Sequence, residues 1–279
     1  MPRKKKIEIN NLVVVSDTHC GCGLALCPPE FQMDDKGSYT YSGFQAKMWE
    51  MWQEFWGEWV PEATRGEPFG VVHNGDAIDG VHHNSTTQIS HNLTDQGRIA
   101  YQVMKPIVEQ CEGRYWHIRG TEAHVGKSGC EEEALAEKLG AIPNELGQYA
   151  RYDLWKQVGD GLVHCLHHIG TTGSRAAETT APHKELVDAF VEASMWGRHI
   201  PNVVVRSHRH RYVSTEIPTK RFMARAVVTP AWQGKTPFVW KIPGARQTTP
   251  QFGGILIRQA HGRLFIDQKI WTVDQSKPE

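Results

Sequence analysis

The sequence lacks a long apolar run, a net charge and a dense set of cysteines. No segment approaches the roughly 18 apolar residues that a membrane-spanning helix needs, so we expect no membrane association. Lys plus Arg is 31 and Asp plus Glu is 31, which argues against bulk attraction to nucleic acid or anionic membranes. A nucleic-acid partner stays open, but the net charge does not indicate it. Six Cys in 279 residues are too few for a disulfide scaffold.

The N-terminal segment has no apolar stretch or cleavage site typical of a secretory signal, although its first six residues are mostly basic. We therefore expect a cytoplasmic protein. The chain length suits one large domain, and neither internal repeats nor low-complexity linkers divide it. We predict a single domain over residues 7–275, with a basic arm at 1–6 and a tail at 276–279. The sequence gives no indication of the oligomeric state.

Short apolar runs repeatedly end in clusters of polar, chemically active residues. The runs are rich in β-branched residues and are typical of buried strands. The polar clusters occupy residues 16–19, 73–76, 119–124, 167–170 and 206–210. Helical patterns lie between the runs, as over residues 44–59, where Pro61 is expected to end the helix. In open α/β sheets, ligands bind beyond the carboxyl ends of strands, so these clusters predict one functional site.

The pattern changes after residue 211, where short strands follow one another without a clear helix between them. The expected strands are Arg221–Val228, Phe238–Lys241, Gly254–Ile257 and Leu264–Ile270. This arrangement predicts an α/β fold completed by a second, more antiparallel sheet.

Histidine is abundant, with 15 residues, and several lie in the polar clusters. Asp17 and His19 stand two apart and can hold one cation together, although a turn Asp beside a surface His fits equally. Asp76 follows a glycine and can place one oxygen on each of two cations, while Asp79 is better suited to a supporting role. In residues 207–210, two His separated by one residue either point into one cavity or belong to a solvated loop.

The motifs D-x-H, G-D-x-x-D, G-x-E-x-H, H-H-x-G and S-H-x-H occur in this order over residues 12–210. The series resembles the calcineurin-like metallophosphoesterase superfamily, whose pattern is D-x-H, G-D-x-x-D/N, G-N-H-D/E, H and G-H-x-H. The resemblance implies an α/β/β/α sandwich, with two central mixed β-sheets flanked by helices. It also implies a dinuclear metal-dependent hydrolase that cleaves a phosphomonoester or phosphodiester by attack of a metal-bridging hydroxide. The alternatives are a DNA nuclease of the same superfamily and a degenerate, non-catalytic metal-binding member.

The resemblance further implies two sets of metal ligands that share one aspartate. The first set is Asp17, His19, Asp76 and His210. The second set is Asp76, a residue of the third motif, one histidine of the 167–168 pair, and His208. Mixed nitrogen and oxygen ligation without thiolate suits manganese, with iron, nickel or zinc as alternatives, better than magnesium or calcium.

The third motif departs from the superfamily pattern, because it has no Asn and its His is displaced. Glu122 is expected to supply the ligand oxygen that Asn would give. Thr121 is a less attractive ligand, since a neutral hydroxyl is a poor donor, and a weak or absent second metal site is the other alternative. His124 is then expected to be catalytic, as proton donor to the leaving group or as a contact to the phosphate.

Besides Asp79, three residues have a predicted supporting or substrate-contacting role. His167 directly follows a strand and is favoured as the ligand, which leaves His168 to support it. Arg119 and Arg175 are candidates for phosphate contact, with structural pairing equally expected for each.

Three segments are expected to shape the pocket, namely residues 20–59, 80–94 and 171–182. The second of them contains His82, His83 and His91. These histidines either line the substrate mouth or belong to a solvated loop.

Overall fold

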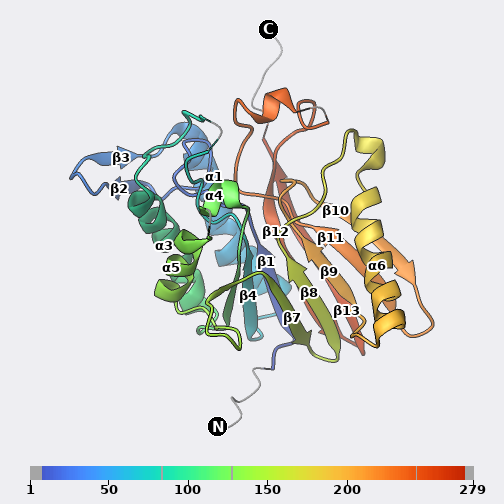
Figure 1. Cartoon of the computed structure of the whole chain (residues 1–279). Helices are drawn as coiled ribbons and strands as arrows, with labels where there is room; N and C mark the ends of the chain where they lie inside the picture. Colours follow the sequence, from blue (N-terminus) through green and yellow to red (C-terminus); the bar gives the residue numbers. More distant parts are fainter. Residues whose placement is uncertain (1–7, 83, 127, 243, 274–279) are drawn as a thin grey trace.

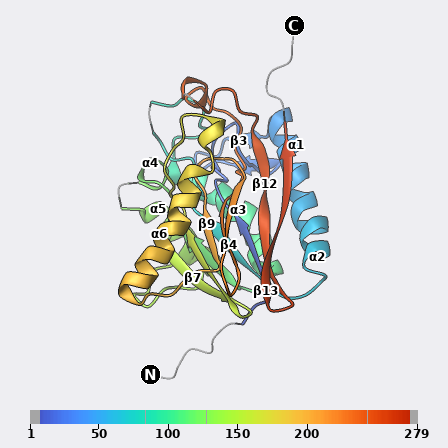
Figure 2. The same cartoon turned by 90° about the vertical axis from the view of Figure 1, so that its right-hand side faces the viewer.

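The computed structural model describes residues 8–82, 84–126, 128–242 and 244–273. The predicted arm at 1–6 and tail at 276–279 lie outside the described residues. Figures 1 and 2 show two β-sheets packed face to face, with helices covering both outer faces. This architecture confirms the predicted α/β/β/α sandwich. Among the described residues, no helix combines the length and the apolar character needed to cross a bilayer.

The first sheet has the strand order β13-β12-β1-β4-β5-β6. Its strands are β13 (Arg263–Thr272), β12 (Gln251–Ala260), β1 (Asn11–Val15), β4 (Phe69–Asn74), β5 (Tyr115–Ile118) and β6 (Ala150–Arg151). Strands β1, β4, β5 and β6 run parallel to one another. Strand β12 pairs antiparallel with β1, and β13 pairs antiparallel with β12. The apolar residues of β1 alternate between the two faces, so that Val13 packs toward helices and Leu12 toward the second sheet.

The second sheet has the order β10-β11-β9-β8-β7. Its strands are β10 (Val213–Pro218), β11 (Met223–Val228), β9 (Val203–Arg206), β8 (Gly161–Leu166) and β7 (Asp153–Val158). Strand β9 runs parallel to both of its neighbours, β8 and β11. The carboxyl ends of β8 and β9 therefore reach the same edge of the sheet, next to the carboxyl ends of β1, β4 and β5 (Figure 1).

The larger helices form the outer layers. One side carries α1 (Gly43–Glu54), a π-helical turn (Phe55–Trp59), α2 (Val60–Ala63), α3 (Leu93–Gln110) and α5 (Cys130–Leu139), and the other side carries α6 (Thr180–Trp196). The remaining elements are the hairpin β2 (Glu30–Gln32) and β3 (Ser38–Thr40), the short α4 (Glu122–Val125), and two 3₁₀ turns (Arg175–Ala177 and Val239–Lys241). The aromatic core on the α1 side includes Trp52, Phe55 and Trp232, all at most 1% exposed.

The expected second, more antiparallel sheet is right for β10 and β11, which pair antiparallel in the second sheet, and wrong for β12 and β13, which belong to the first. Strand β12 crosses to the first sheet and pairs with β1, in a register that sets Val13 opposite Leu256. It can occupy this position because its central residues are buried on both faces. Each sheet is consequently mixed.

Two local expectations are also wrong. The run Phe238–Lys241 contains a 3₁₀ turn rather than a strand, and its Phe238 and Trp240 are more than 40% exposed. Pro61 does not end the first helix, because the backbone passes through the π-helical turn and Pro61 lies near the start of α2. A proline is tolerated there because the N–H groups of the first helical turn have no partner within the helix, so that a residue without an N–H costs little stability.

Candidate metal centre

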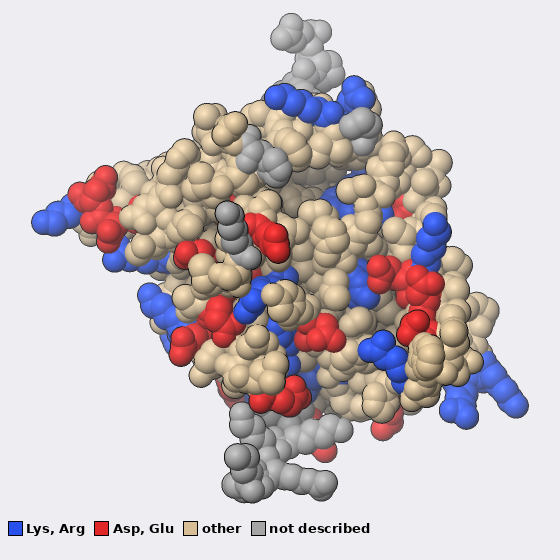
Figure 3. Space-filling model, viewed as in Figure 1, with Lys and Arg blue, Asp and Glu red and all other residues tan. Residues whose placement is uncertain are grey.

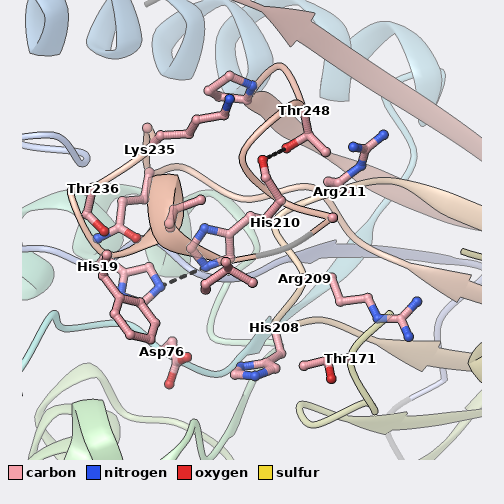
Figure 4. Close-up of a pocket in the computed structure, with 18 of the residues that line it drawn as sticks. His19, Asp76, Thr171, His208, Arg209, His210, Arg211, Lys235, Thr236 and Thr248 are labelled. Atoms are coloured by element: carbon pink, nitrogen blue, oxygen red, sulfur yellow. Dashed lines mark hydrogen bonds between the residues drawn. The ribbon is translucent and has the colours of Figure 1, made fainter. Parts of the chain in front are cut away.

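The sequence clusters meet at the carboxyl ends of five strands. Asp17 and His19 follow β1, and Asp76 follows β4. Thr121 and His124 follow β5, His167 follows β8, and His208 and His210 follow β9. Figure 4 shows His19, Asp76, His208 and His210 around one space. Residues separated by almost two hundred positions are therefore neighbours, as expected for a site at this edge of an α/β sheet.

The first candidate ligand group contains Asp17, His19 and His210, whose ligand atoms all lie within 4.8 Å of one another. His19 Nε2 is 3.1 Å from His210 Nε2, which in turn is 3.3 Å from Asp17 Oδ1. Atoms that bind one cation at about 2.1 Å lie roughly 3.0–3.5 Å from each other. The spacing of this group therefore suits a single divalent cation.

The second candidate ligand group contains Asp76, His167 and His208. His167 Nε2 lies 3.0 Å from Asp76 Oδ2. The other ring nitrogen, Nδ1, lies 2.6 Å from the Asn74 carbonyl oxygen and donates to it when it carries the proton. That contact fixes the ring and turns Nε2 toward the carboxylates, an arrangement typical of metal-binding histidines. Asp76 also forms a group with His19 and His124, so it lies between the two candidate sites.

The charges of the cluster are buried and incompletely paired. Asp17 Oδ1 and His167 Nε2 have no hydrogen-bond partner among the described residues. Burial alone would raise the pKa of Asp17, but His167 and His210 outweigh it and hold that pKa below its usual value. Burial likewise opposes protonation of His167, yet Asp76 and Asp17 raise its pKa to about 10. Buried oxygen and nitrogen donors with unfilled positions fit divalent cations.

The backbone of the candidate ligands is strained. Among the described residues, ten non-glycine residues have positive φ, and five of these are candidate ligands: Asp17 (51°), His19 (41°), Asp76 (55°), His208 (71°) and His210 (55°). Such conformations are costly and cluster at functional sites. They are held here by hydrogen bonds between loops, with the Asp17 N–H donating to Gly75 O at 2.9 Å and the His19 N–H donating to Asp76 O at 3.0 Å.

Two glycines permit the close approach of the loops. A Cβ atom on Gly120 would lie 2.0 Å from Asp76 Oδ1, and one on Gly75 would lie 2.5 Å from His167 Nδ1. A side chain at either position would displace a candidate ligand, which explains why both clusters contain glycine.

The third motif places Thr121, rather than Glu122, against the cluster. The Thr121 N–H donates to Asp76 Oδ1 at 2.7 Å, and its hydroxyl lies 3.3 Å from both Asp76 oxygens. Glu122 is exposed at the start of α4 and belongs to none of the four candidate ligand groups found among the described residues. The structure therefore does not bring the expected third-motif ligand together with the others, since Glu122 is the exposed first residue of α4.

His124 lies at the opening of the cluster. Its Nδ1 is 2.6 Å from the Asp79 carbonyl oxygen, and its Nε2 is 4.0 Å from Asp76 Oδ2. Burial lowers the pKa of His124 to about 4, against a partial opposing effect of Asp76. With Nδ1 engaged by the backbone, Nε2 is the nitrogen left to face the cavity.

Asp79 supports the cluster, and His168 lies at its edge. Asp79 is buried, accepts hydrogen bonds from Gln233 and Gln88 at 2.9 and 2.7 Å, and lies 3.5 Å from His19 Nδ1. It is thus placed to orient the His19 ring. His168 is exposed, belongs to none of the candidate groups, and packs its ring 4.6 Å from that of His208.

The two candidate phosphate-binding arginines lie away from the cavity. Arg119 pairs with Glu133 at 3.3 Å and stacks over the Tyr152 ring. Arg175 is mostly exposed and lies 3.9 Å from Glu178. Neither lines the cavity, so their structural pairing is what the contacts support.

A cavity of about 440 Å³ opens over the cluster. Of the three histidines expected near the mouth, His82 lines the cavity, His91 is exposed, and His83 lies outside the described residues. No sequence motif indicated the far wall, which includes Arg211, Lys235 and much of residues 233–250. The available signal was the length of the connection between β11 and β12, since long loops without strands are often functional.

Comparisons with known proteins give matches only among solved structures. No protein-family model matches the chain, and no curated protein sequence matches it. Vps29 from Entamoeba histolytica, solved with zinc, aligns at 10% identity and a TM-score of 0.41, over 94% of this chain and 98% of that one. Vacuolar protein sorting 29 from Cryptosporidium parvum gives 10% and 0.38, over 95% and 98%. The sulfate thiohydrolase SoxB from Thermus thermophilus gives 11% and 0.40, over 97% of this chain and 57% of that one. Likenesses this weak carry no functional argument, which depends on the site itself.

Proposed function

We propose that the protein is a phosphoester hydrolase that depends on two divalent cations. The observation that carries the proposal is the pair of buried ligand groups that meet around Asp76 at the floor of an open cavity. Their residues are those of the motif series that resembles the calcineurin-like metallophosphoesterases. The same series implies a substrate that is a phosphomonoester or a phosphodiester.

The chain would hold one cation with Asp17, His19 and His210. It would hold the other with His167 and His208, and Asp76 would be shared between the two. When bound, the cations neutralise the phosphate charge and activate a water molecule for in-line attack. Manganese is the first candidate for the donor set, with iron, nickel or zinc as alternatives. A cytoplasmic location stays a prediction.

The surrounding residues position the ligands rather than react. Thr121 fixes both oxygens of Asp76 from one side. Asp79 orients His19, and the Asn74 carbonyl orients His167. Ligand atoms that are held in place before a cation binds need less reorganisation on binding.

His124 is the proposed proton donor to the leaving group. Its Nε2 faces the cavity, and its Nδ1 contact with Asp79 O fixes the ring. Burial holds the pKa of His124 near 4, and the negative charge of a bound phosphoester favours the protonated ring. The proton can then pass from Nε2 to the departing oxygen.

A non-catalytic metal-binding role is the second candidate, and the third motif favours it. Thr121 occupies the place beside Asp76 with a neutral hydroxyl, which is a weaker cation ligand than an amide or carboxylate oxygen. A chain of this kind would bind cations without turnover.

The test measures hydrolysis of p-nitrophenyl phosphate, bis-p-nitrophenyl phosphate and single-stranded DNA with Mn²⁺, Ni²⁺, Zn²⁺ or Mg²⁺, together with bound metal. We expect turnover of at least one of the nitrophenyl esters with Mn²⁺. Metal binding without turnover of any ester would support the second candidate and overturn the first. Turnover of DNA alone would identify the site as that of a nuclease.

A further inference from the structure

The cavity extends well beyond the candidate ligands. Its floor contains His19, Asp76 and His208, and its far wall comes from the β11–β12 connection together with Arg211, which precedes β10. In Figure 4, Lys235 and Arg211 lie on the opposite side of the drawn residues from Asp76 and His208. The lining of the cavity also includes the apolar residues Phe238, Val239 and Ile242 and the hydroxyl-bearing residues Thr236, Thr248 and Thr249. The space beyond the cations is therefore shaped for more than a bare phosphate.

The far wall is fixed in position by contacts with the rest of the cavity. Gly244 packs so closely against residues 172–173 that a Cβ there would lie 2.9 Å from the Thr172 and Gly173 backbone. Lys235 Nζ donates to the Arg246 carbonyl at 2.9 Å and thereby joins the two limbs of the connection. These two contacts fix the connection against the rest of the cavity, so the wall is an ordered part of the site.

A buried guanidinium lines this space and has an N–H donor without an acceptor among the described residues. Arg211 is only 8% exposed and lines the cavity, and its Nη1 has no hydrogen-bond partner among the described residues. Its Nε lies 3.1 Å from Glu178 Oε1, so one side of the guanidinium is paired. A buried guanidinium with an unpaired N–H group is stabilised most strongly by a hydrogen bond to an anionic oxygen.

A second cation stands near Arg211. Lys235 is 9% exposed, and its ammonium lies 4.1 Å from the centre of the Trp240 ring. Burial lowers the pKa of Lys235, and the positive charge of Arg211 lowers it further. Two cations that repel each other across a shared cavity wall are stabilised when an anion binds between them.

We infer that Arg211 and Lys235 form a subsite for a second anionic group, and that the substrate is a small phosphoester carrying such a group. The inference rests on the proposed function, since it places the ester phosphate at the cation site. The apolar side chains between the two ends would contact the organic part of the substrate. A bisphosphate or a carboxylated phosphoester has this chemistry.

The surface charge favours a small substrate over a long polyanion. Lys and Arg are interspersed with Asp and Glu on the face shown in Figure 3, without a continuous basic path across its described part. Tracking of an extended nucleic acid requires such a path. Arg211 and Lys235 instead lie in the lining of the cavity.

The experiment measures binding by calorimetry to the manganese-loaded protein, with probes that cannot be hydrolysed. Phenylphosphonate has one anionic group, whereas 4-phosphonobenzoate and 4-(phosphonomethyl)benzoate carry a second one at two distances. We expect at least one carboxylated probe to bind about tenfold more tightly than phenylphosphonate. Because no turnover is needed, this result does not depend on whether the protein hydrolyses p-nitrophenyl phosphate.

Three variants test which residues cause the preference for the carboxylated probes. Arg211→Gln should abolish the preference for the carboxylated probe. Glu178→Gln should increase it, because the competing carboxylate beside Arg211 is removed. Arg225→Gln serves as the matched control, since Arg225 is ion-paired with Glu216 on β10 and β11 and does not line the cavity. Thermal unfolding confirms that each variant is folded.

The inference is overturned if neither carboxylated probe is preferred, or if Arg211→Gln keeps the preference. A loss of preference in both Arg211→Gln and Glu178→Gln would indicate a structural role for the pair, and it would contradict the subsite as well.

Discussion

Two buried histidine clusters lie side by side in this protein, and they differ in how their carboxylates are used. The cation cluster leaves Asp17 Oδ1 without a hydrogen-bond partner among the described residues. In the neighbouring cluster of His73, His117 and Glu132, both carboxylate oxygens accept backbone N–H groups, from Ala77 at 2.7 Å and Gly120 at 2.6 Å.

In the second cluster one nitrogen of each imidazole contacts a neutral hydroxyl, and His117 Nε2 lies 3.7 Å from Glu132 Oε1. His73 Nε2 lies 3.0 Å from the Thr18 hydroxyl, and His117 Nδ1 lies 2.6 Å from the Tyr115 hydroxyl. The two rings stack at 5.0 Å. Burial and the proximity of His117 lower the pKa of His73 well below its usual value. Buried histidine alone therefore does not identify a metal site, whereas the convergence of several histidines on the carboxylates of Asp17 and Asp76 does.

The sharpest test of this difference is Asp76→Asn. We expect it to lower turnover of p-nitrophenyl phosphate by at least about 10³-fold, because the shared ligand loses its charge. Bound manganese, measured by atomic emission, should fall as well. Asp267→Asn, on the exposed ion pair with Arg258, is the control. Intact turnover in Asp76→Asn would contradict the assignment.

Glu132→Ala should show the opposite pattern, with the main effect on stability. The change leaves two buried N–H groups without partners, at a cost of about 3 kcal/mol in the free energy of unfolding. Urea denaturation of the metal-free protein measures it, and Glu137→Ala on the exposed side of α5 is the control. If Glu132→Ala unfolds at the same urea concentration as the control, the two clusters do not differ as described.

His124→Ala tests the proton donor at the edge of the cation cluster. We expect a loss of about 10²-fold on an alkyl phosphate, whose leaving group needs a proton, and a smaller loss on p-nitrophenyl phosphate. His91→Ala, at an exposed site, is the control. Equal losses on the two substrates would show that His124 does not protonate the leaving group.

Substitutions in the third motif should have smaller effects on cation affinity, and the comparison of Thr121 with Glu122 shows which residue supports the site. Thr121→Val should weaken binding of the second cation roughly tenfold, because Asp76 loses a supporting hydroxyl. Glu122→Gln should weaken it less, given the exposed position of Glu122. Titration with Mn²⁺ followed by calorimetry measures both affinities. The reverse order would restore Glu122 as the ligand.

The pH dependence of stability should be shallower in His73→Gln. In the metal-free wild type, unfolded His73 takes up a proton below pH 6.5, whereas the folded chain keeps this ring neutral. The unfolded state then binds more protons, so His73 makes stability rise with pH up to about 6.5. Between pH 5 and 6.5, the slope of the free energy of unfolding against pH should be lower in the variant by up to about 1.4 kcal/mol per pH unit. Urea unfolding at several pH values measures the slope, and an unchanged slope would contradict a neutral His73.

Much of the fold could be predicted because burial leaves a local pattern. The β-branched runs before Asp17, Asp76 and His208 indicate buried strands, and the architecture brings their ends together. The placement of β12 could not be read in this way, because an apolar strand fits either sheet. Its pairing with β1 depends on which edge the rest of the chain leaves open.

The site was predictable where ligands follow strands directly. It was not predictable where a helical turn intervenes, as at Glu122, or where the chain returns from a distant loop, as at Lys235. Arg211 directly follows the last histidine of the series, yet its burial and its pairing with Glu178 depend on contacts that no local pattern encodes.

The most direct test of the account is a crystal of the manganese-loaded protein measured at the manganese absorption edge. We expect two anomalous peaks about 4 Å apart. One should lie beside Asp17, His19 and His210, the other beside His167 and His208, and Asp76 should contact both. Peaks elsewhere, or no ordered manganese near Asp76, would contradict it.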